Sequence, residues 1–114
     1  MQVQTFYNFN FSGFFGYDSP YTDEFENLLK RGVSRPDLFR LVQKAHNSGE
    51  AEIPITEHFT LLFSRVHGEW DMNLCFVRDG FTTVLFTVRN NGCSYRKWCE
   101  AINAALLTFY GEAA

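Results

Sequence analysis

The sequence predicts an α+β domain of two layers, in which an antiparallel sheet carries its helices on one face. Three consecutive segments, at 57–67, 70–77 and 81–89, read as strands separated by turn residues, and side-chain polarity alternates along the second and third, which is typical of a meander of strands. Other segments repeat apolar residues every three or four positions, as amphipathic helices do. The expected order is β-α-α-β-β-β-α, in a single domain over residues 1–114.

The first strand is predicted over residues 3–12, because an aromatic ring occupies every second position from Tyr7 to Phe11 and polar residues fill the positions between. We expect this strand to join an edge of the meander. Glycines at both ends of residues 13–16 then predict a turn.

Two helices are predicted between this strand and the meander. Thr22 is the expected N-cap of the first, which covers residues 22–31, with acidic residues in its first turn and Gly32 after its last. Ser34 is expected to cap the second, whose apolar stripe continues to a stop at residues 47–49.

The strands of the meander are joined by turns predicted at residues 67–69 and 78–80, each of which contains a glycine. The first of the three strands is apolar on both sides, so we expect it in the interior of the sheet. On the outer face of the other two, Cys75, Val77 and Leu85 stand among threonines and could extend a contact patch or mediate homodimerisation.

The last helix has the most regular pattern. A break is predicted at residues 90–92, after which Ser94 is expected to cap the helix and Gly111 to end it. One continuous apolar stripe should pack on the sheet, and it consists of Trp98, Ile102, Ala105, Leu106 and Phe109.

Composition narrows the class of protein. The net charge is −3 and the pI is near 5.5, which gives little attraction for polyanions. We recognise neither a secretory signal nor an apolar run of the ~18 residues that a membrane span requires. Cys93 and Cys99 are separated by five residues, rather than by the two to four that are typical of zinc ligands. With Cys75 they are expected to be reduced thiols in a cytoplasmic protein that has no metal and no cofactor.

The N-terminal segment is the strongest functional signal. Eight of the twenty aromatic residues fall between Phe6 and Tyr21, and no charged residue precedes Asp18. Such rings either complete the core or form a patch for a protein partner, where aromatic residues are favoured. The candidate contact residues are the rings of Phe6, Phe14, Phe15, Tyr17 and Tyr21 and the acids Asp18, Asp23, Glu24 and Glu26.

The leading hypothesis is therefore a non-catalytic binding domain that occludes a site on a larger protein or protein complex, including one that handles nucleic acid. Small acidic domains of this size include toxin-immunity proteins and phage anti-defence proteins such as anti-CRISPRs, and we expect an inhibitor of this type. An acidic helix could compete with nucleic acid for a basic groove on the target.

A second hypothesis is RNA binding. From Ser34 to Gly111 the predicted order is α-β-β-β-α, and Gly92-x-Ser94 is followed by basic residues at the entry of the last helix. This arrangement resembles the double-stranded-RNA-binding domain. The resemblance implies phosphate contacts across a groove, which would here be made by Arg89, Arg96 and Lys97.

A third hypothesis is a small enzyme. His67, Glu69 and Asp71 form the densest group of titratable residues and would suit general acid–base chemistry. Cys99 follows Arg96 by about one helical turn, a placement that can activate a thiol. The sequence contains no nucleotide-binding glycine motif and no nucleophile elbow, so we expect no catalysis.

Overall fold

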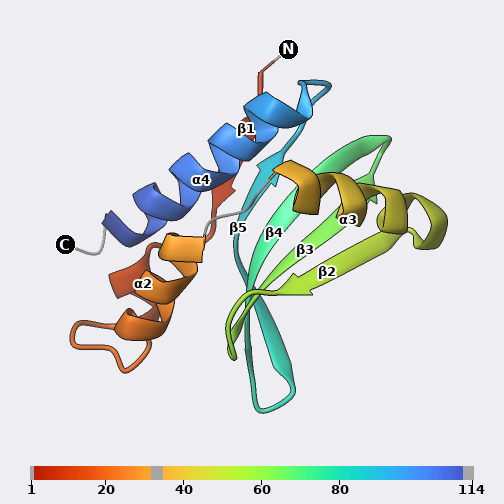
Figure 1. The fold of residues 1–114 in the computed structure, drawn as a ribbon. Helices are drawn as coiled ribbons and strands as arrows, with labels where there is room; N and C mark the ends of the chain where they lie inside the picture. The colour runs from red at the N-terminus through yellow and green to blue at the C-terminus, as the bar shows by residue number, and fades with distance from the viewer. Residues whose placement is uncertain (1, 32–34, 112–114) are drawn as a thin grey trace.

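The computed structural model describes residues 2–31 and 35–111, and within them it confirms the α+β class. Five antiparallel strands form one sheet in the order β1-β5-β4-β3-β2, and the helices pack against it (Figure 1). In chain order the elements are β1 (Gln4–Tyr7), α1 (Phe11–Phe15), α2 (Thr22–Arg31), α3 (Arg35–Ser48), β2 (Glu50–Pro54), β3 (Phe59–Val66), β4 (Glu69–Arg78), β5 (Phe81–Arg89) and α4 (Tyr95–Gly111).

The inner face of the sheet and the apolar stripes of the helices share one core. Figure 1 shows α4 beside β1 and β5, and α3 in front of β2 and β3. The stripe predicted for α4 is buried along its whole length, and its Trp98 meets Phe63 of β3 at a ring distance of 5.5 Å. The Trp98 indole also donates to the Val88 carbonyl at 3.0 Å, so the polar atom of this buried ring has a partner.

Both predicted hairpin turns are confirmed. His67 and Gly68 join β3 to β4, while Asp79 and Gly80 join β4 to β5, and all four residues have φ between 51° and 82°. Positive φ at both central positions defines the type I′ turn, which matches the twist of paired strands. As expected, β1 pairs with β5 at one edge of the sheet, and β3 lies inside it between β4 and β2.

The first strand is shorter than predicted, because β1 ends at Tyr7 and residues 11–15 form the one-turn helix α1. The Asn10 side chain accepts a hydrogen bond from the Gly13 amide at 2.7 Å and so caps α1. The extended strand expected to residue 12, and the turn expected after it, are therefore wrong.

Strand β2 was not predicted. It follows directly after Gly49, whose φ of 88° and hydrogen bond to the Ala45 carbonyl end α3. Side-chain burial alternates here as it does in a strand, since Ala51 is buried and its two neighbours are exposed. It has only five residues and ends in Pro54, so it carries a weak strand pattern. Its presence places four strands between α3 and α4, whereas the double-stranded-RNA-binding order has three.

The expected outward position of Leu85 is wrong. The register shifts between Leu74 and Cys75, so that Leu74 pairs with Phe86 and Cys75 pairs with Val84. The extra residue on β5 is Leu85, which is fully buried with Phe86. A β-bulge of this kind breaks strict alternation and lets two consecutive residues enter the core.

The caps differ between helices. Thr22 does not cap α2, because its hydroxyl donates to the Ser19 carbonyl at 3.0 Å and it lies inside the helix. At α4 the predicted cap is confirmed, since the Ser94 hydroxyl accepts from the Lys97 amide at 3.3 Å. The expected C-cap Gly32 and N-cap Ser34 lie outside the described residues.

Candidate docking site

The aromatic rings of the N-terminal segment divide into a buried set and an exposed set. Phe11, which is 3% exposed, is the centre of the buried set. Its ring lies 4.7 Å from Phe15, 5.5 Å from Phe25 and 5.3 Å from Tyr110. Tilted and edge-on ring pairs at these distances are favourable, so this part of the segment joins α1 and α2 to the end of α4.

Three of the predicted contact residues are half-buried on the flank of this core. The rings of Phe14, Phe15 and Tyr21 stand 5.7, 5.0 and 4.9 Å from Phe76 of β4. The Tyr21 ring also faces the guanidinium of Arg78 at 6.0 Å. These three rings therefore stabilise the packing of α1 and α2 on the sheet. Only part of the surface of each ring is left for another molecule.

Glu24, another predicted contact residue, turns toward the segment before β3. Its Oε2 accepts from the Thr56 hydroxyl at 2.6 Å and from the His58 amide at 2.7 Å. Its Oε1 lies 2.8 Å from Nδ1 of His58. Burial alone raises the pKa of Glu24, but the hydrogen bonds from Thr56 and His58 and the charge of His58 outweigh it and hold the net pKa below its ordinary value.

Tyr17 is the most exposed ring of the segment, at 83%. The chain around it is set by two residues with left-handed backbone, Gly16 at φ 80° and Asp18 at φ 58°. Glycine adopts this conformation freely and aspartate tolerates it better than most residues. The loop between α1 and α2 consequently places the ring on the surface.

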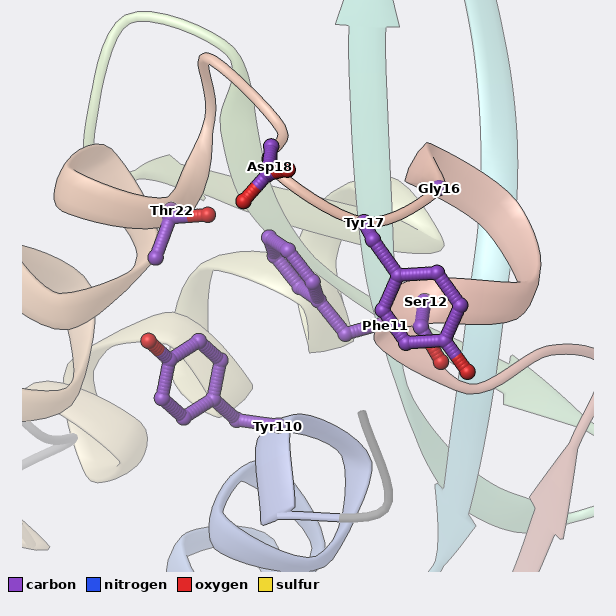
Figure 2. Close-up of a pocket in the computed structure, with 7 residues that line it drawn as sticks. All are labelled: Phe11, Ser12, Gly16, Tyr17, Asp18, Thr22 and Tyr110. Atoms are coloured by element: carbon purple, nitrogen blue, oxygen red, sulfur yellow. The ribbon is translucent and has the colours of Figure 1, made fainter. Parts of the chain in front are cut away.

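A hollow of about 280 Å³ lies beside this ring. In Figure 2 the Phe11 ring stands between Tyr17 on one side and Tyr110 on the other. We call this the aromatic hollow, and it is lined by Phe11, Ser12, Gly16, Tyr17, Asp18, Thr22 and Tyr110.

Tyr110 connects the aromatic hollow to the acidic side of α2. Its hydroxyl donates to Oε1 of Glu26 at 2.8 Å. That hydrogen bond raises the pKa of Tyr110, and partial burial and the negative charges of Glu26 and Asp23 raise it further. The hydroxyl therefore stays protonated at neutral pH and holds the carboxylate of Glu26 next to the hollow.

Three exposed carboxylates surround this region. Asp18 lies on the rim of the hollow, Asp23 in the first turn of α2, and Glu26 on the tyrosine hydroxyl. Among residues 2–31 and 35–111, none of the three forms an ion pair with a basic side chain. Their charge is therefore available to a partner, and we call them the acidic rim.

Phe6 lies apart from the aromatic hollow, on β1 opposite Thr87 of β5. The ring is 47% exposed and faces the guanidinium of Arg89 at 5.5 Å. The candidate contact residues thus occupy two places, the outer edge of the sheet and the segment that runs from α1 through the following loop into α2.

The basic residues proposed for RNA contact have acidic partners in two of three cases. Arg89 binds both carboxylate oxygens of Asp71, at 2.9 and 3.0 Å. The hydrogen bond and the charge of Asp71 raise the pKa of Arg89. Arg96 lies 3.4 Å from Glu100 one helical turn on, and Lys97 is exposed. The positive charge at the entry of α4 is therefore largely compensated.

The residues proposed for catalysis lie at two places, His67 and Glu69 at the first hairpin turn and Cys99 on α4. His67 is exposed in the first hairpin turn, Glu69 opens β4, and Cys99 is buried on α4. Asp71 pairs with Arg89 instead. In the part of the chain that the structure describes, no group of three or more His, Cys, Asp or Glu could hold a metal ion. A second hollow, of about 480 Å³ beside Trp70 and Tyr95, contains none of these residues.

Sequence reasoning selected Tyr17 and Asp18 but missed Phe11, Thr22 and Tyr110 as parts of one site. The signal for Tyr110 was its position, because it directly follows the last residue of the apolar stripe of α4 and so begins the neighbouring face of the helix. What could not be read from the sequence is that α4 ends beside α2.

Comparisons with known protein families, proteins and structures assign no family to this chain. No family model, curated protein or solved structure matches this chain. Within residues 2–31 and 35–111, none of the helices combines the length and the apolar character that crossing a membrane requires.

Proposed function

We propose that the chain is a non-catalytic protein-binding domain that docks on a basic surface of a larger protein. The observation that supports this most is the juxtaposition of an 83% exposed tyrosine, Tyr17, an aromatic hollow and an acidic rim that lacks basic partners among the described residues. Interface centres favour tyrosine, and complementary charge accelerates association.

The proposed mode of action is steric occlusion. The rings of Phe15 and Tyr21 pack on Phe76 before and after the loop that carries Tyr17, which reduces the conformational entropy that this loop can lose on binding. The carboxylates of the acidic rim would stand where a basic groove otherwise receives phosphate groups. This favours a target that handles nucleic acid and an inhibitor of the immunity or anti-defence type.

Affinity capture tests the proposal. The tagged full chain is incubated with extract of its source cells, and captured proteins are quantified by mass spectrometry for the natural chain and for the variants Tyr17→Ala and Asp23→Asn. The proposal expects a captured basic protein whose yield falls with each variant and with rising salt.

Phe81→Ala is the matched control, because Phe81 is 78% exposed in the second hairpin and lies outside the aromatic hollow. It should leave capture unchanged. Capture that is equally strong for all variants would contradict the proposal. Salt-sensitive retention of the purified chain on a polyanion column would instead favour the RNA hypothesis.

A further inference from the structure

We infer that the aromatic hollow accepts the guanidinium of an arginine side chain from the partner protein. The inference deepens the proposed function and rests on it, since it names the chemical group that the docking surface recognises. It depends on three features of the hollow: its rings, its charge and its size.

The exposed ring of Tyr17 and the partly exposed ring of Tyr110 supply surface for a cation, whereas Phe11 is only 3% exposed. Phe11 forms the base of the hollow, and Tyr17 and Tyr110 flank it (Figure 2). The negative face of an aromatic ring attracts a cation, and a planar guanidinium stacks on it more readily than an ammonium does. The same chemistry already occurs in this fold, where Arg78 faces Tyr21 at 6.0 Å and Arg89 faces Phe6 at 5.5 Å.

The charge around the hollow selects a cation over an anion. The N-terminus of α2, which begins at Thr22, contributes about half a positive charge. The acidic rim contributes negative charge at Asp18, Asp23 and Glu26, and among the residues that the structure describes no basic side chain lines the hollow. The net field therefore favours a positive group, and the five N–H donors of a guanidinium can reach carboxylates on more than one side.

The size of the hollow suits one side chain. A hollow of about 280 Å³ is at the small end of the range for ligand sites. It is lined by the surface loop between α1 and α2, so a side chain that projects from a protein surface can enter it without any movement of the core.

The experiment is an NMR titration of the ¹⁵N-labelled full chain with acetyl-arginine methylamide. The matched probe is acetyl-citrulline methylamide, which has nearly the same shape without the charge. We expect only the arginine probe to shift the amide resonances of residues 11–22 and of Tyr110. These shifts should saturate at probe concentrations on the order of millimolar.

Variants locate the site. Tyr17→Ala and Asp18→Asn should each weaken arginine binding about two- to fivefold, the effect of losing one exposed cation–ring or charge contact. Asparagine tolerates the left-handed backbone at position 18, so the loop is preserved. Phe81→Ala should bind arginine like the natural chain.

Three results would overturn the inference: no saturable shift with arginine, equal shifts with citrulline, or arginine shifts that the two variants leave unchanged. The titration needs no partner, so its outcome is independent of the capture experiment. Loss of capture in Tyr17→Ala together with no arginine-specific shift would retain the docking surface and refute only the guanidinium assignment.

Discussion

Glu24→Ala is expected to destabilise the fold by about 2–3 kcal/mol. The carboxylate accepts from the Thr56 hydroxyl at 2.6 Å and the His58 amide at 2.7 Å, and lies 2.8 Å from the His58 ring. A hydrogen bond to a charged group contributes about 1.5–3 kcal/mol. The three contacts share one partly exposed carboxylate and are not additive, so we expect a total loss of about the size of one strong bond, well below their sum. For a chain of this length the Tm should fall by about 8–12 °C.

Asp23→Ala is the matched control for this change. Asp23 also lies in the first turn of α2, so it shares the favourable helix-dipole interaction of roughly 0.3–1 kcal/mol, but it is exposed. Urea unfolding followed by circular dichroism measures both variants. If Glu24→Ala and Asp23→Ala lowered the free energy of unfolding equally, the stabilising role of the Glu24 carboxylate in the fold would be refuted.

The Glu24 contribution also depends on pH. Because the pKa of Glu24 is lowered in the folded chain, its stabilisation is fully present above the unfolded pKa of about 4.3 and is lost as the pH falls through the folded pKa. Glu24→Gln removes the charge but keeps an acceptor. The stability difference between the natural chain and Glu24→Gln should therefore shrink as the pH is lowered below about 4, and a constant difference would contradict this reasoning.

Three further predictions concern the rest of the fold. Phe11→Ala should lower the free energy of unfolding by about 3–5 kcal/mol and shift the urea midpoint to a clearly lower concentration; a loss under ~1 kcal/mol would be contrary to its central position. Burial raises the pKa of the Cys75 thiol to about 11, so iodoacetamide at neutral pH should modify it only after unfolding, and rapid labelling of the folded chain would be inconsistent. Arg89→Ala should lower the Tm more than Arg96→Ala, because it leaves the buried Asp71 without its partner; equal shifts would contradict this.

Where a single local pattern determined the structure, the sequence was sufficient. The stripe from Trp98 to Phe109, the alternation through Met72 and Leu74, and the Asp79-Gly80 turn all predicted the elements that are observed. Each depends on residues close together in the chain. Predictions failed where an interaction with a distant part of the chain determined the local structure, as the pairing of β5 with β4 does at the Leu85 bulge.

The same limit applies to the candidate site. The exposed positions of Tyr17 and Asp18 follow from a short loop with left-handed residues, which composition could suggest. The role of Glu24 could not be separated from that of its acidic neighbours, because it depends on residues more than thirty positions away. The contribution of Tyr110 likewise depends on how α4 meets α2.

Site-specific photo-crosslinking tests the central claim most directly. A benzophenone amino acid is placed at Tyr17 or, as the control, at Phe81, both of which are strongly exposed, and irradiation is carried out in the source cells. The account predicts one dominant adduct with a basic protein from position 17, attached next to an arginine of that protein, and none from position 81. Identical adducts from both positions, or none from position 17, would contradict it.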